Sequence, residues 1–344
     1  MPTKRIEYID AMRGFTMMLV VYSHIVHGCF HLDAFTFNKF FHLFRMPLFF
    51  FISGWVMYKA TRVWDTQETL RFLGNKFMVQ IIPTAFFLAL FIYTLGVPKL
   101  KVWYDAYKLG YWFTFMLFQY FLFYVSIMLV IPKRMKNTYS EDAVVLFFGV
   151  VIAVVSLLSR MGLIHSYTLT QYIGSVNWYY FLFFCFGTLV KKHFDAFIQL
   201  TDNKWFMAVV VITTILLSVS YTRMGRLANT FSQMAIGAFC IVIILTFFRK
   251  NESHLTKDKR LGNALQYIGR RTLDIYLLHY FFLPVNLHIV GKFFKAHNNP
   301  TVEFFVSMVF ALMVIACSLT VSNLIRLSPF LAKYLFGVKE KKTA

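Results

Sequence analysis

Apolar runs close to twenty residues long alternate with short polar segments along this chain. About twenty apolar residues in a helix span the hydrocarbon core of a bilayer. The pattern therefore predicts an all-α fold, a polytopic transmembrane helical bundle of about ten spans. The predicted spans are 11–30, 39–58, 77–96, 111–131, 142–159, 177–190, 205–222, 229–248, 267–290 and 303–325.

The composition agrees with a membrane protein. Apolar residues make up 58% of the 344 residues and charged residues only 15%, whereas about a quarter of a soluble domain is charged. The segments between the spans are too short to fold alone. We therefore expect a single integral-membrane domain over residues 1–344.

The net charge of +20 is distributed as in a membrane protein rather than a nucleic-acid-binding one. With the N-terminus inside, 24 of the 35 Lys and Arg residues fall on the inner side and nine on the outer side, while Arg13 and Arg45 lie within spans. Cytoplasmic segments carry such an excess of positive charge. The distribution predicts that both termini are cytoplasmic and that membrane lipids, not nucleic acid, contact the basic segments.

The first span contains three ionisable residues, Asp10, Arg13 and His24. Arg13 and His24 are 11 residues apart, which in a helix is three turns plus about 20°, so both lie on one face roughly 16 Å apart along the axis. Ionisable groups inside a membrane are costly and by default indicate a functional interior. The alternative is that Asp10 and Arg13 reach the membrane interface and that His24 only packs.

The second span repeats this combination. His42 and Arg45 are three residues apart, Pro47 follows them, and the small pair Ser53 and Gly54 stands near the end of the span. Proline removes a backbone donor and loosens a helix, and small residues permit close helix packing. A kinked interfacial helix would explain one such Arg, but two consecutive spans each hold an Arg and a His.

These motifs resemble the membrane-bound acyltransferase type 3 family. Arg13 and His24, with ten residues between them, are similar to its Arg-X10-His signature. Residues 41–54, Phe-His-Leu-Phe-Arg-Met-Pro-Leu-Phe-Phe-Phe-Ile-Ser-Gly, resemble its Phe-rich motif. Residues 267–279 resemble a late Gly-Arg…Tyr-Leu-x-His segment, and residues 177–179 a mid-chain segment with Trp178. The likeness is greatest to members related to fucose 4-O-acetylases.

The resemblance implies an enzyme that moves an acetyl group from cytoplasmic acetyl-CoA to a hydroxyl of an envelope sugar or polysaccharide. Such a reaction needs a base for the hydroxyl proton. His24 suits that role near neutral pH, either directly or through a covalent acyl-histidine, and the Arg13 guanidinium suits a CoA phosphate. The expected substrate-binding residues are Asp10, His42, Arg45, Ser53, Trp178, Tyr276 and His279.

The same resemblance implies the substrates and the cellular location of the enzyme. Acetyl-CoA is a co-substrate, a carbohydrate is the acceptor, and no metal is expected. The protein is expected to be a multi-pass protein of the bacterial inner membrane, and a homo-oligomer remains open.

Two other classes of protein would also have many apolar spans. In a transporter or channel the intramembrane Arg and His residues would line a permeation path, but no internal repeat is visible, as many transporters have. A non-catalytic scaffold or sensor would leave the buried Arg and His residues without a purpose.

Overall fold

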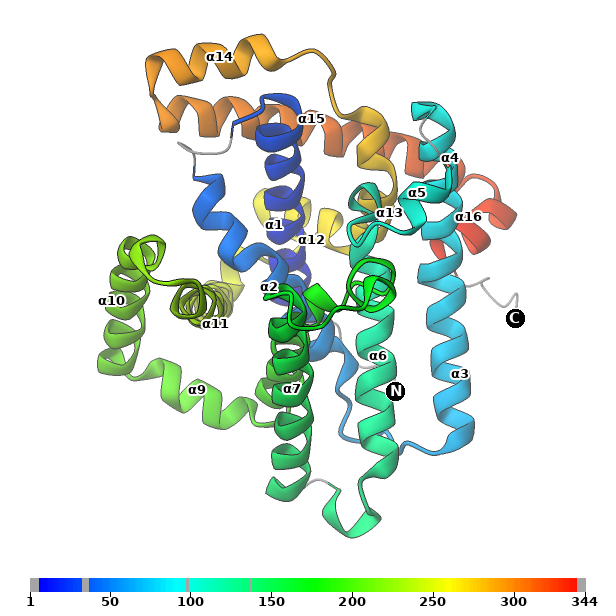
Figure 1. The fold of residues 1–344 in the computed structure, drawn as a ribbon, viewed down its shortest axis with the longest axis vertical. Coiled ribbons are helices and arrows are strands. Elements are labelled where there is room, and N and C mark those ends of the chain that lie inside the picture. The colour runs from blue at the N-terminus through cyan, green and yellow to red at the C-terminus, as the bar shows by residue number, and fades with distance from the viewer. Residues whose placement is uncertain (1–5, 33–36, 97–98, 137, 339–344) are drawn as a thin grey trace. The chain divides into compact units, whose positions relative to one another are not determined.

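The structure is a computed structural model that describes residues 6–32, 37–96, 99–136 and 138–338. Every regular element within these ranges is helical (Figure 1). The predicted all-α fold is therefore confirmed. Two compact units divide the chain, and each is described by itself.

The first unit comprises residues 1–52 and 193–322. Its core contains α1, whose faces pack against α11, α12 and α13. Its helices are α1 (Glu7–His24), the first part of α2 (Asn38–Met57), α9 (Phe194–Asp202), α10 (Lys204–Ser220), α11 (Arg226–Lys250), α12 (Arg260–Arg270), α13 (Thr272–Leu278), α14 (His288–His297) and most of α15 (Pro300–Ile325).

The second unit comprises residues 53–192 and 323–344. Here α7 packs against α8 and against η6 (Ser175–Tyr180), the 3₁₀ segment that directly precedes α8. The helices are the end of α2, then α3 (Thr66–Lys76), α4 (Ile82–Leu95), α5 (Lys99–Trp103), α6 (Trp112–Val130), α7 (Tyr139–Arg160), α8 (Phe181–Lys192) and α16 (Pro329–Phe336).

Seven helices of the described chain are long and apolar enough to cross a membrane. They correspond to seven of the predicted spans and cover 38–57, 66–95, 112–130, 139–160, 204–223, 228–250 and 300–325. In the described chain, the other three predicted spans, 11–30, 177–190 and 267–290, do not form a single helix that is both long enough and apolar enough to cross a membrane. The count of ten and the cytoplasmic position of the termini stay predictions.

The predicted span 267–290 is not one continuous helix. Helix α12 ends at Arg270, because Arg271 has a non-helical backbone (φ −110°, ψ 17°), and α13 starts at the next residue. The following 3₁₀ turn, η9 (His279–Phe282), ends before Leu283, whose ψ is 123°. Leu283 precedes a proline, and that position disfavours the helical conformation. The charged residues Arg270, Arg271 and Asp274 surround the first break, and Pro284 follows the second.

The predicted span 77–96 is part of a longer helical stretch that begins at Thr66. The Asp65 carboxylate accepts a hydrogen bond from the Glu68 backbone N–H at 2.8 Å and so caps the first turn. Such a cap satisfies one of the free N–H groups at a helix start. The polar turn before the apolar run therefore continues the helix beyond the span.

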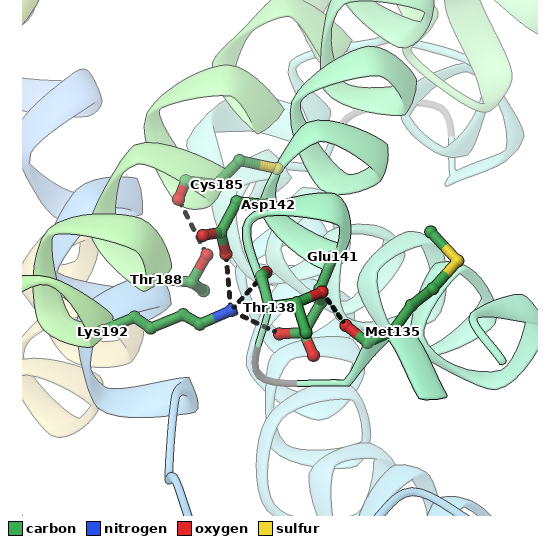
Figure 2. A network of polar contacts seen from close by, with 7 residues as sticks. All are labelled: Met135, Thr138, Glu141, Asp142, Cys185, Thr188 and Lys192. Atoms are coloured by element: carbon green, nitrogen blue, oxygen red, sulfur yellow. Dashed lines mark hydrogen bonds and ion pairs between the residues drawn. The ribbon is translucent and has the colours of Figure 1, made fainter. Parts of the chain in front are cut away.

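A buried ion-pair network joins α7 to α8 in the second unit (Figure 2). The Lys192 ammonium lies 2.6 Å from Asp142 Oδ1 and 3.1 Å from Glu141 Oε1. All three side chains are largely buried. The network holds the end of α8 to the start of α7, and breaking a buried pair is strongly destabilising.

Candidate active site

The first span forms the helix that the sequence predicts, so Asp10, Arg13 and His24 share one continuous helix, α1. His24 is its last residue, and the chain continues as a wider π turn, η1 (Ile25–Cys29). π turns occur often at functional sites. His24 thus stands where the regular hydrogen-bond ladder changes.

Helices α1 and α12 approach so closely that two glycines are required at the crossing. A Cβ on Gly14 would lie 2.0 Å from the carbonyl oxygen of Leu265, and one on Gly269 would lie 1.8 Å from that of Asp10. Both distances are far below van der Waals contact. The Gly269 of the late motif therefore has a steric role, since it brings α12 against the helix that carries Arg13 and His24.

Arg13 is held by the chain that follows α12. Its Nη2 donates to the Thr272 hydroxyl at 3.0 Å, and that hydroxyl donates in turn to the Gly269 carbonyl at 3.3 Å. The Arg13 side chain is half-buried. The Thr272 hydroxyl therefore holds the Arg13 guanidinium in place on α1.

The His24 imidazole meets Tyr280 from η9. Its Nε2 lies 3.2 Å from the Tyr280 hydroxyl, and the two ring centres are 5.1 Å apart in an edge contact. The ring centre of His279 lies 5.2 Å from that of His24. The first and the last of the sequence motifs therefore meet at one place in the first unit.

The backbone of α13 fixes the ring of His279. Its Nδ1 lies 2.9 Å from the carbonyl oxygens of both Ile275 and Tyr276. The Tyr276 ring is buried and its centre lies 6.2 Å from the His279 ring centre. Tyr276 thus helps to orient the His279 ring through its main-chain carbonyl. Any residue at this position could supply that carbonyl, so the tyrosine side chain did not indicate this role.

Arg45 and His42 hydrogen-bond to each other on α2. Arg45 Nη2 donates to His42 Nδ1 at 3.1 Å, and Nη1 donates to the Asn38 side-chain oxygen at 3.1 Å. Arg45 also lies near enough to interact electrostatically with His24 and Tyr280. Arg45 is therefore part of the surroundings of His24, whereas His42 is exposed and holds Arg45.

Asp10 is buried, with 7% of its surface exposed. It supplies the carbonyl against which Gly269 packs. Its expected place beside Arg13 on α1 is confirmed by the helix, and its role in binding a substrate stays a prediction.

Ser53 and Trp178 belong to the second unit. Ser53 precedes Gly54, where a Cβ would lie 1.9 Å from the Phe184 carbonyl oxygen, so this part of α2 packs tightly on α8. Trp178 Nε1 donates to the Gln119 side-chain oxygen at 2.7 Å. The Gly54 approach and the Trp178 hydrogen bond pack the second unit, and the roles of Ser53 and Trp178 toward a substrate stay predictions.

Sequence reasoning missed Tyr280, Thr272 and Glu303. Tyr280 directly follows the predicted His279, but nothing in the sequence indicates that its hydroxyl meets His24. Glu303 is 1% exposed, and its carboxylate accepts hydrogen bonds from Ser307 at 2.7 Å and from Tyr22 of α1 at 3.3 Å. A carboxylate at the start of an apolar run was the available signal for Glu303.

A cavity of about 360 Å³ opens beside the start of α2 in the first unit. Its lining combines aromatic rings, hydroxyl groups and one ammonium, from Phe37, Lys39, Phe40, Leu43, Ser218, Tyr221, Thr222 and Pro300. The size is within the range of small-molecule sites. Among the described residues, no group of three or more His, Cys, Asp or Glu side chains is placed to hold a metal ion.

The fold and this site define a multi-pass helical membrane protein with two histidines side by side in its interior. The family model described as an acyltransferase domain, that of the type 3 acyltransferases, matches residues 6–321. The chain therefore belongs to this family and is a membrane acyltransferase. No curated protein and no solved structure matches it significantly. The likeness to fucose 4-O-acetylases within the family stays a prediction.

Proposed function

We propose that this protein is an acyl-CoA-dependent O-acyltransferase that transfers an acetyl group from cytoplasmic acetyl-CoA to a hydroxyl of an envelope sugar or polysaccharide. The family match and the imidazole of His24 beside Tyr280 support this proposal. The proposed setting is the bacterial inner membrane.

In the proposed reaction His24 acts as the general base. It takes the proton of the acceptor hydroxyl while the hydroxyl oxygen attacks the thioester carbonyl carbon; the C–S bond then breaks and CoA leaves as its thiolate. The proton on His24 afterwards passes to the thiolate or to water. The Tyr280 hydroxyl at 3.2 Å orients the His24 ring, and proton transfer by a positioned base typically contributes about 10²–10⁴-fold to the rate.

Arg13 holds the phosphates of the donor at the other end of α1. Arg13 and His24 lie roughly 16 Å apart along the helix. The reacting thioester and hydroxyl therefore cannot contact both side chains at once. The pantetheine arm of CoA would extend along the face of α1 that they share. A planar guanidinium recognises phosphate oxygens through paired hydrogen bonds.

The cavity beside α2 supports an acceptor that arrives from outside the cell. Lys39, in its lining, lies on the outer side of the predicted topology, opposite the cytoplasmic donor. Aromatic rings and a few polar groups are the usual lining of small-molecule sites. The Phe40 ring contacts Phe41, and Phe41 contacts Tyr22, two residues before His24.

The observation that carries the proposal is the meeting of His24 with Tyr280. The test is to incubate the purified protein with acetyl-CoA labelled in the acetyl group and with a panel of envelope glycans and methyl glycosides. An O-acyltransferase passes label to a sugar. A protein that neither consumes acetyl-CoA nor labels any sugar contradicts the proposal and favours a transporter or channel.

A further inference from the structure

The two ring nitrogens of His279 have different hydrogen-bonding states. Nδ1 lies 2.9 Å from two carbonyl oxygens, those of Ile275 and Tyr276. A carbonyl oxygen only accepts hydrogen bonds, so Nδ1 carries a proton. A neutral imidazole carries one proton in all, and Nε2 of neutral His279 therefore presents only a lone pair.

This lone pair has no hydrogen-bond partner within the part of the chain that the structure describes. The His279 side chain is fully buried, and its Nε2 receives no hydrogen bond there. A buried acceptor without a donor is unfavourable, and such groups are few in native proteins. The orphaned nitrogen therefore points to a ligand that supplies a donor.

The position of His279 beside the proposed base favours the acceptor molecule as that ligand. Its ring centre lies 5.2 Å from the ring centre of His24, a separation too small for two independent sugars. A hydroxyl has one proton, and in the proposed function the reactive hydroxyl gives that proton to His24. A different hydroxyl of the same molecule is then available as the donor to His279.

We propose that His279 Nε2 accepts a hydrogen bond from the hydroxyl next to the reactive one, so that the site selects a vicinal diol. This inference rests on the proposed function. It makes His279 a specificity-determining residue. A site built to bond a substrate hydroxyl rejects the analogue that lacks it, because a buried polar group is then left unpaired.

The experiment measures acetyl transfer to methyl hexopyranosides and to their single-deoxy analogues. NMR of each product identifies the acetylated position. We expect that removing one hydroxyl next to that position lowers kcat/KM by about tenfold or more, although this hydroxyl is not itself acetylated. The His279→Leu variant should lower kcat/KM for the parent sugar and bring the ratio of parent to deoxy analogue close to one.

His297 provides a matched control. Its Nδ1 also lies 2.9 Å from a carbonyl oxygen four residues earlier, that of Phe293, but its side chain is exposed. The His297→Leu variant should keep the parent-to-deoxy ratio of the wild type. His279→Gln, whose amide can donate to a carbonyl while its oxygen accepts, should retain part of the discrimination.

Each failure has its own signature. Wild-type protein that acetylates sugars but accepts every neighbouring deoxy analogue equally overturns this inference and leaves the proposed function standing, even if His279→Leu does not fold. A His279→Leu variant that lowers transfer to parent and deoxy sugars by one factor also overturns it. Absence of any acetyl-CoA consumption contradicts the proposed function and the inference together.

Discussion

The Tyr280 hydroxyl lies 3.2 Å from His24 Nε2, although 256 positions separate these residues in the sequence. The contact joins the end of α1 to the 3₁₀ turn after α13. It gives the imidazole a fixed orientation that the sequence pattern alone does not provide. Variants of either His24 or Tyr280 can therefore test the role of His24.

Replacing His24 with Ala should reduce acetyl transfer by about 10²-fold or more, the usual contribution of a general base. Expression and thermal stability in detergent should stay close to those of the wild type. The measurement is initial-rate transfer from acetyl-CoA at saturating donor. His165→Ala, which removes an exposed histidine, is the control, and normal transfer by His24→Ala would eliminate the assignment of His24 as base.

Tyr280→Phe removes the hydroxyl that meets His24 and keeps the ring. A hydrogen bond contributes about 0.5–1.5 kcal/mol, so kcat should fall by about two- to tenfold while donor affinity stays the same. The pH profile of kcat should also move, because the environment of the base changes. Tyr93→Phe, at a ring that is 75% exposed, should change neither quantity; an unmoved pH profile in Tyr280→Phe would argue against a positioning role.

Arg13→Ala and His24→Ala should separate donor binding from chemistry. Losing a charge-assisted phosphate contact typically removes about 1.5–3 kcal/mol, so acetyl-CoA affinity should fall roughly ten- to a hundredfold in Arg13→Ala. His24→Ala should bind the donor almost normally. Isothermal titration calorimetry with acetyl-CoA measures both.

Two further variants test whether Arg13 binds the donor phosphates. Arg13→Lys should restore affinity only in part, because an ammonium lacks the planar fork. Thr272→Val, which removes the hydroxyl that holds Arg13 at 3.0 Å, should weaken binding less than Arg13→Ala. If Arg13→Ala binds the donor normally and His24→Ala does not, the donor enters from the opposite direction.

Gly269→Ala should disrupt the crossing of α1 and α12. The new Cβ would lie 1.8 Å from the Asp10 carbonyl oxygen, which forces the backbones apart, and overpacking typically lowers the free energy of unfolding by about 1–3 kcal/mol. The expected result is a lower Tm in detergent. Gly74→Ala in α3 is the matched control, since no atom lies within 4 Å of its added Cβ and alanine favours a helix by about 1 kcal/mol. Equal Tm values for the two variants would contradict the close crossing.

The Lys192 network should give the protein a stability that depends on pH. Burial lowers the pKa of Lys192, but the hydrogen bonds to Asp142 and Glu141 outweigh it and raise the pKa above its ordinary value. A raised folded-state pKa means that the stabilisation is fully present below the ordinary lysine pKa of about 10.4 and is lost as the pH rises through the raised value.

Lys192→Met should therefore lower Tm at neutral pH and flatten its decrease at alkaline pH. The Lys191 ammonium lies 4.9 Å from the centre of the Trp55 ring, and the Lys191→Met control should keep the alkaline decrease. Thermal unfolding of the three proteins across the alkaline range measures this. A wild-type Tm that does not respond to alkaline pH, or an unchanged decrease in Lys192→Met, would argue against the ion pairs.

The sequence by itself determined the all-α membrane fold and the placement of Arg13 and His24 on one helix. Both conclusions depend on local properties, namely the length of apolar runs and the 3.6-residue period. The prediction of a single span failed over 267–290, where the helix breaks at Arg271, beside Arg270, and stops before Pro284.

Only the tertiary structure decided which groups surround His24. The contact of His24 with Tyr280, the steric need for Gly269 and the orphaned nitrogen of His279 all depend on how α12, α13 and η9 pack against α1. Packing between helices far apart in the chain is set by the summed shapes of both surfaces, and no periodicity within one segment encodes it. For that reason the resemblance could assign His24 and His279 to one expected site, but only the packing set their rings 5.2 Å apart.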